Sequence, residues 1–224
     1  MNRANLLWQL GRYKEANDAL AEASAVASQA EASYKILLAW VHLTYSQMAL
    51  SERRLGDVQK RGRQALEIAG TQYRDIAVSA KCSIALADVL SGAPQPARRF
   101  CEEAVATARE AKTPRLLSSA LLALAEVLLL ANDGPGALKT AQEAQHMFER
   151  GQQRDSEWRA WLIAARASQL AGNRAAAQEY ASRADSLCEG LRQQWGSDAY
   201  EGYLRRPDIQ SYRSQITQIN SRSK

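Results

Sequence analysis

The sequence predicts an all-α protein, organised as an α-solenoid of about five helix-turn-helix repeats with a capping helix at the C-terminal end. Three observations favour this fold. Alanine, leucine, glutamine, glutamate and arginine dominate the 224 residues, and this composition is typical of helices. Two small residues seven positions apart recur five times along the chain. Loop-forming glycines and prolines separate long apolar segments that have helical periodicity.

The recurring small pair defines the repeat. Its first members are separated by 46, 35, 40 and 40 residues, so the period lies near 40 residues. Because seven residues make about two turns of an α-helix, both small residues lie on one face, where a second helix can approach closely. We therefore expect each pair to lie in a seam between helices. The five pairs are Ala16 and Ala23, Gly62 and Ala69, Ala97 and Ala104, Ala137 and Ala144, and Ala177 and Ala184.

The first two hairpins are the least regular. In the first, only a short helix over about residues 4–10 precedes the turn. Such a helix would leave the apolar face of the next hairpin open, so we expect that the chain is cut from a longer protein or pairs with another molecule at this end. In the second hairpin Gly62 replaces the first alanine, and the loop around "SERRLGDV" is expected to be extended.

The last three hairpins carry clearer signals for helix starts and turns. The loop of the third, at 91–96, is expected to be about two residues short. In the fourth, Thr113 is a credible N-cap and Pro114 fits the first helical position. The sequence "NDGPG" then breaks this helix, and Pro135 starts the next one. The remaining expected helices cover 114–131, 156–171 and 174–195, with a turn at Gly172-Asn173 in the fifth hairpin.

The C-terminal segment departs from the repeat. Pro207 can start a last helix that runs to about Ile219, with Ile209, Tyr212 and Ile216 on one face. A terminal helix outside the repeat that covers the last seam is the usual cap of a solenoid. We therefore expect residues 1–196 to form the repeat array, with a truncated first repeat, 197–220 to form capping helices, and 221–224 to be a disordered tail.

Charge and cysteine content restrict the class of protein. The net charge of +5 is mild, and acidic residues are interleaved with the basic ones, so a nucleic-acid partner is not expected. Cys82, Cys101 and Cys188 are odd in number and far apart, which favours buried thiols in a reducing compartment, the cytoplasm. The most apolar run, 116–131, is too short and too polar to cross a membrane. A membrane partner is therefore not expected.

Residues with catalytic or metal-binding potential are few. His42 and His146 lie in different hairpins, and neither has a cysteine or carboxylate at the spacing of a metal ligand. No glycine-rich phosphate-binding motif and no nucleophile motif of the G-x-S-x-G type occurs. The sequence therefore predicts no catalytic residue, no cofactor and no metal, and a protein that is not an enzyme.

The repeat resembles the tetratricopeptide repeat family in its long-helix variety. The family pattern has W-x2-L-G/A on the first helix, a G-x-Y turn, and alanines seven apart on the second helix. Gly11, Tyr13 and Ala16 match it in the first hairpin, and Trp161 and Gly172 match it in the fifth. The resemblance covers about residues 4–190 and implies a right-handed superhelix. It is specific for the fold and weak for function, because one scaffold serves many partners.

The resemblance also implies where a partner binds. In this family the first helices of successive repeats line a concave groove that receives a peptide or another protein domain. The family's groove positions fall on these partner-binding candidates: Lys81, Asp88, Leu122, Glu126, Arg159, Leu162, Arg166 and Gln169.

Two functions follow from the resemblance and stay open. The first is a non-enzymatic protein–protein interaction module that binds a peptide or protein domain in the groove. The second is an effector-sensing, regulatory domain cut from a larger signalling protein, such as a signal-transduction ATPase or a transcription regulator. The expected partner is accordingly a protein, a peptide or another domain of the same parent protein. Self-association through the N-terminal repeat is a further alternative.

Overall fold

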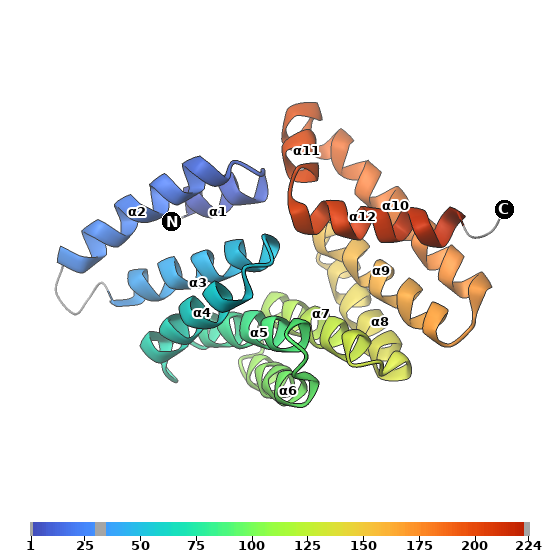
Figure 1. Ribbon diagram of the computed structural model, residues 1–224, viewed down its shortest axis with the longest axis horizontal. Coiled ribbons are helices and arrows are strands. Elements are labelled where there is room, and N and C mark those ends of the chain that lie inside the picture. The colour runs from blue at the N-terminus through green and yellow to red at the C-terminus, as the bar shows by residue number, and fades with distance from the viewer. Residues whose placement is uncertain (1, 30–34, 222–224) are drawn as a thin grey trace.

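The computed structural model describes residues 2–29 and 35–221, which form twelve helices and no strand within those ranges (Figure 1). Ten helices pair into five successive hairpins, and two more helices follow. This confirms the predicted α-solenoid. The helices are α1 (Asn2–Gln9), α2 (Tyr13–Gln29), α3 (Lys35–Ser51), α4 (Leu55–Ala69), α5 (Arg74–Leu90), α6 (Pro94–Glu110), α7 (Pro114–Leu130), α8 (Gly134–Arg150), α9 (Arg154–Leu170), α10 (Arg174–Trp195), α11 (Ser197–Leu204) and α12 (Pro207–Ser221).

The five hairpin turns have one common geometry. Each joins its two helices with three residues, and the middle residue has a positive φ. The expected extended loop in the second hairpin and short loop in the third are therefore wrong. Arg53 occupies the position that glycine or asparagine occupies in the other four turns. Because arginine is not a typical turn residue, the sequence does not indicate this regular turn. The middle residues are Gly11, Arg53, Gly92, Asn132 and Gly172, with φ of 69, 60, 86, 63 and 74°.

The small residues lie in the seams as predicted. Nine of the ten residues in the five pairs are buried, and Ala23 is half-buried. Around them, the core is divided into several clusters that follow the solenoid. One spans α5 to α9, a second spans α9 to α12, and a third joins α1, α2 and α3. Each seam is therefore stabilised mainly by its own neighbours, as in other repeat proteins.

Gly62→Ala is expected to destabilise the second hairpin. An added Cβ would lie 2.7 Å from Ile84 Cγ1 and 3.2 Å from Ser46 Oγ, and buried Ile84 has little freedom to move. Overpacking costs about 1–3 kcal/mol, which exceeds the gain of ~1 kcal/mol from replacing glycine within a helix. Urea denaturation should show a net loss. Gly190→Ala in α10 is the control, since its Cβ meets nothing within 4 Å, and it should stabilise.

Two helix starts differ from the expectation. Thr113 does hold the N-cap position of α7, but its hydroxyl donates to the carbonyl of Ala111 instead of capping the helix. In the next turn Asp133 is the N-cap of α8, and its Oδ1 accepts from the amide of Gly136 at 2.9 Å. The helix therefore starts at Gly134, one residue before Pro135. The expected tail at 221–224 lies outside the described residues, except for Ser221, the last residue of α12.

The C-terminal helices do more than cover the last seam. Ile209, Tyr212 and Ile216 are buried, as predicted for a cap. However, α12 also crosses to the concave side of the solenoid, where the Tyr212 hydroxyl donates to Glu126 of α7. The adjacent α11 meets the turn between α1 and α2, so the two ends of the array lie side by side (Figure 1). The helices consequently form a ring that surrounds one central pocket.

Candidate functional site

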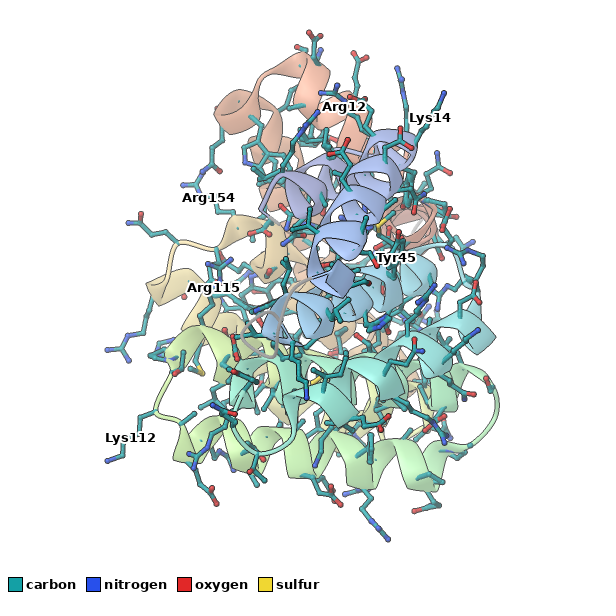
Figure 2. The ribbon with its side chains drawn as sticks, turned by 90° about the vertical axis from the view of Figure 1, so that its left-hand side faces the viewer. Arg12, Lys14, Tyr45, Lys112, Arg115 and Arg154 are labelled. Atoms are coloured by element: carbon teal, nitrogen blue, oxygen red, sulfur yellow. The ribbon has the colours of Figure 1, made fainter. Side chains whose placement is uncertain are left out.

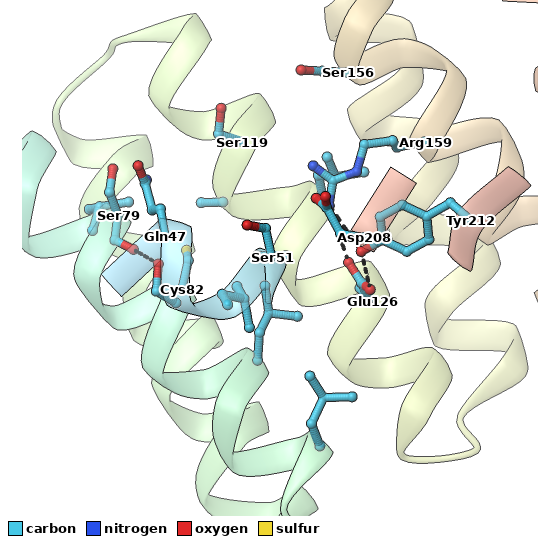
Figure 3. A pocket seen from close by; sticks show the side chains of 18 of the residues that line it. Gln47, Ser51, Ser79, Cys82, Ser119, Glu126, Ser156, Arg159, Asp208 and Tyr212 are labelled. Atoms are coloured by element: carbon cyan, nitrogen blue, oxygen red, sulfur yellow. Dashed lines mark hydrogen bonds and ion pairs between the residues drawn. The ribbon is translucent and has the colours of Figure 1, made fainter. Parts of the chain in front are cut away.

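The central pocket is the candidate site. Its volume is about 210 Å³, and its walls come from the first helix of every hairpin together with α12 (Figure 3). One wall comes from α3, α5 and α7 and is mainly apolar. Of the described residues that line the pocket from these helices, only Glu126 is charged, and the uncharged polar ones among the apolar side chains are Gln47, Ser51, Ser79, Ser83 and Ser119. The other is polar and comes from α7, α9 and the start of α12. The principal apolar residues are Leu50, Val78, Cys82, Leu86, Leu116, Ala120, Leu122 and Ala123; the principal charged and aromatic ones are Trp8, Arg53, Glu126, Arg159, Arg206, Asp208 and Tyr212.

Glu126, Arg159 and Tyr212 form a polar network at the base of the polar wall. The Tyr212 hydroxyl donates to Glu126 Oε1 at 2.7 Å, and Arg159 Nη2 lies 3.5 Å from Glu126 Oε2. Arg159 Nη2 also donates to the Tyr212 hydroxyl at 3.3 Å. Only 5% of Glu126 is exposed, so its carboxylate depends on these two partners for hydrogen bonds and charge. Figure 3 shows the three side chains converging from α7, α9 and α12.

Tyr212 and Arg159 each keep a single protonation state in this network. Burial and, after it, the Glu126 carboxylate raise the pKa of Tyr212 well above its ordinary value. Burial alone would lower the pKa of Arg159, but its neighbours Tyr212 and Glu126 outweigh this, so the Arg159 pKa is raised. The tyrosine therefore keeps its proton and the arginine keeps its charge at ordinary pH. The network offers hydrogen bonds and a permanent charge, which suits binding better than proton transfer.

Arg206 and Asp208 form a second buried pair in the wall of the pocket. Arg206 Nε and Nη2 donate to the two carboxylate oxygens of Asp208 at 3.1 and 2.6 Å. The guanidinium of Arg206 also lies 4.7 Å from the ring centre of Trp8 and 5.6 Å from that of Tyr203. Trp8 in turn donates to Ser51 Oγ at 3.2 Å. This group of side chains joins α1, α3, α11 and α12 at the pocket wall.

The mouth of the pocket lies where its lining residues are exposed. Arg53, in the turn after α3, and Ser119, near the start of α7, are both exposed. Burial increases from these residues toward Ala120, Glu126 and Tyr212, all of which are below 9% exposure. The side chain of Arg159 in the polar network is itself 27% exposed, so a binding partner that enters at the mouth would meet both walls.

Three of the sequence-predicted groove residues line this pocket. They are Leu122, Glu126 and Arg159. A fourth, Arg166, lies on the same helix as Arg159 and is half-buried. Burial lowers the pKa of Arg166, and the charge of Glu126 partly offsets this.

The other four predicted residues lie elsewhere. Lys81 forms a 2.8 Å ion pair with Glu103 of α6. Asp88 accepts a hydrogen bond from Gln59 Nε2 of α4 at 2.8 Å. Leu162 is buried in the C-terminal cluster, and Gln169 is exposed outside the pocket.

Sequence reasoning missed the pocket residues outside the repeat. The arginine pair in "YLRRPD" carries no signal in the sequence beyond its positive charge, yet Arg206 is buried and paired with Asp208. Tyr212 was assigned to the apolar face of the cap, although its hydroxyl contacts α7. The signal that could have identified them is a buried face of α12 that carries Asp208 and Tyr212 among isoleucines, because buried polar groups need partners.

The basic residues of the surface are dispersed. Arg12 and Lys14 project near the start of α2, whereas Lys112 and Arg154 project from two other parts of the molecule (Figure 2). Arg98 is shared between Glu102 and Asp133, at 2.9 and 3.2 Å. These contacts show solvated faces with mixed charge and no continuous basic stripe among them.

His42 is half-buried against Arg61 and not part of the pocket. Arg61 Nη1 lies 3.2 Å from His42 Nδ1, a contact that suits the neutral imidazole as acceptor. Burial, and then the charge of Arg61, lower the pKa of His42 below 6.5. Because the unfolded chain takes up this proton more readily, stability should be intact above about pH 6.5 and fall as the pH drops below it.

His42→Gln tests this pH dependence. Urea denaturation between neutral and mildly acidic pH should show a smaller loss of stability for the variant than for the native chain. His146→Gln, at an exposed position of α8, is the control and should keep the native pH dependence. An unchanged dependence in His42→Gln would contradict the assignment.

Comparison with known proteins identifies the fold. No model of a protein family matches the sequence, and no curated protein is significantly similar to it. Among solved structures, the apo form of RapI is similar with a TM-score of 0.63 and 11% identity, over 97% of this chain and 95% of that chain. Aspartyl phosphate phosphatase F from Bacillus subtilis has a TM-score of 0.65 and 18% identity, over 97% of this chain and 58% of that chain. At these identities the similarity shows a shared helical-repeat fold.

Among the described residues, no helix is both long and apolar enough to cross a membrane.

Proposed function

We propose that the chain is a non-enzymatic interaction module that binds a peptide or a short segment of a protein in the central pocket. The pocket itself carries this proposal. It combines a mainly apolar wall with a small polar network, an arrangement typical of binding sites. Its lining residues come from every hairpin, so a bound segment would contact the whole array.

The position of α12 favours a short segment over a long one. In an open solenoid an extended peptide can follow the concave groove across all the repeats. Here Tyr212 and Asp208 of α12 occupy part of that surface. The space that remains, about 210 Å³, accommodates one or two side chains and not an extended chain.

The name of one structural neighbour raises the question of catalysis. That neighbour is an aspartyl phosphate phosphatase. Our proposal for this chain remains binding without catalysis, because Tyr212 and Arg159 are held in single protonation states. We also propose that the protein lies in the cytoplasm and that its partner is neither a nucleic acid nor a membrane.

A displayed library of short random peptides tests the proposal. Peptides selected on the native chain are measured by calorimetry against the native chain and against Ser119→Trp, which places a large ring at the exposed mouth. Ser182→Trp, at an exposed position of α10, is the control. The proposal predicts that binding is lost in Ser119→Trp and kept in Ser182→Trp. Equal binding to both variants would place the site elsewhere.

A second candidate function is an effector-sensing, regulatory domain of a larger signalling protein. The contact between the two ends of the array favours it, because the residues of this contact also line the pocket. A bound effector could thereby affect both ends of the chain. Thermal denaturation with the small-molecule fraction of a cell extract tests this candidate. Stabilisation of the native chain but not of Ser119→Trp would support an effector over a peptide.

A further inference from the structure

The two ends of the array meet through closely packed backbones. Gly11 lies in the turn between α1 and α2, and Gly202 lies in α11. A Cβ on Gly202 would come within 2.4 Å of the Leu10 carbonyl oxygen, and one on Gly11 within 2.2 Å of the Gly202 carbonyl oxygen. No side chain larger than hydrogen fits either position without separating the two ends.

Arg206 is the main side chain at this contact. Its guanidinium lies between the ring of Trp8, from α1, and the ring of Tyr203, from α11. Its charge is already paired with Asp208, two residues further along the chain. The attraction between the ends therefore rests on a cation–π contact and on the fit of two backbones, not on an ion pair that spans them.

The apolar core does not continue across the contact. The N-terminal cluster packs Ala4, Leu7 and Leu20 against α3, and the C-terminal cluster packs α11 and α12 against α9 and α10. The two clusters share no residue. Every other seam of the ring buries apolar side chains between neighbouring helices, so the contact between the ends is the weakest seam.

We propose that this contact is a clasp, which can open while all the repeats stay folded and which controls access to the central pocket. This inference rests on the proposed binding function of that pocket. Trp8, Arg206 and Asp208 belong to the clasp and to the pocket wall at once. Opening the clasp therefore removes part of the wall. An occupant that contacts both Trp8 and Arg206 binds the closed ring more tightly than the open one and keeps the clasp closed.

Gly202→Ala is the variant that opens the clasp. Alanine is the better residue within a helix, so the change should strengthen α11 while its Cβ collides with the Leu10 carbonyl. Gly190→Ala makes the same exchange within α10, where the Cβ meets nothing within 4 Å. Trp8→Leu is a second opening variant, which removes the ring beneath Arg206.

Electron paramagnetic resonance measures the clasp directly. Spin labels are attached at Asp18→Cys and Asp198→Cys, both exposed, in a Cys82→Ser background. Cys101 and Cys188 should not react, because both are fully buried, and burial also raises the pKa of Cys188 to about 11. Gly202→Ala and Trp8→Leu should give longer, broader distances than Gly190→Ala. An unchanged short distance in both would overturn the clasp.

The native Cys82 thiol measures access to the pocket. It lines the pocket and is 9% exposed. Methyl methanethiosulfonate should label Cys82 faster in Gly202→Ala than in Gly190→Ala. We expect a difference in rate of roughly tenfold, which corresponds to a free energy of clasp closure of ~1.4 kcal/mol. Equal labelling rates of Cys82 in the two variants would overturn the inference. Labelling of Cys101 and Cys188 as fast as that of Cys82 would overturn it too, because this result would show that the variant unfolds. Neither measurement uses a ligand, so failure of the clasp is distinguishable from failure of the Ser119→Trp binding test.

Discussion

Arg159→Leu is expected to lower the free energy of unfolding by about 2–4 kcal/mol, because it leaves the Glu126 carboxylate buried without its cation. The Tyr212 hydroxyl would remain as a hydrogen-bond donor, but it carries no charge to balance the carboxylate. The loss should appear in urea denaturation as a lower midpoint with an unchanged slope.

Two further variants make this prediction specific. Glu126→Gln combined with Arg159→Leu should recover more than half of the lost stability, because a neutral amide can still accept from Tyr212. Arg109→Leu removes an exposed arginine, 57% accessible, from its contact with Glu143 and should cost about 0–1 kcal/mol. If Arg159→Leu lowers the free energy of unfolding no more than Arg109→Leu does, the network of Glu126, Arg159 and Tyr212 does not stabilise the fold as we expect.

Trp158→Ala is expected to have the largest effect, about 3–5 kcal/mol, because Trp158 is fully buried between α9 and the C-terminal helices. Its ring packs edge-to-face with that of Tyr212, with ring centres 6.1 Å apart, and its Nε1 donates to the Tyr203 hydroxyl at 3.1 Å. The substitution would leave a cavity and remove the donor to Tyr203. The support for α11 and α12 is thereby lost.

Hydrogen exchange should show where the structure loosens. In a solenoid each seam is stabilised by its neighbours, so α11 and α12 should lose protection while α5 to α8 keep theirs. Trp161→Ala, three residues further along α9, is the matched control. Trp161 is half-buried against Tyr180, with ring centres 5.2 Å apart, and its loss should be smaller. Uniform loss of protection over all helices in Trp158→Ala would contradict a local role.

The repeat architecture was predictable because it repeats. One small pair per hairpin, five times, reports the same packing requirement, so an irregularity such as Gly62 does not hide the pattern. The turn after α3 was not predictable in the same way. Arg53 adopts a left-handed conformation without the glycine or asparagine that usually indicates it.

The site was only partly predictable, for a physical reason. Glu126 and Arg159 belong to repeats, so a family resemblance could place them on the concave side. Tyr212 and Arg206 lie outside the repeats, and their contacts with α7 and α1 join positions 86 or more residues apart. Periodicity within a helix carries no information about such distant contacts, because they depend on how far the superhelix turns before the chain ends.

Small-angle X-ray scattering of the native chain tests most directly whether the array closes around its pocket. A compact domain of this length has a radius of gyration of ~17 Å, and a closed ring should lie close to that value. The account predicts a scattering curve that agrees with the closed ring, and a larger radius for Gly202→Ala. A native curve that fits only an elongated superhelix with separated ends would contradict the account, because the concave side would then be an open groove.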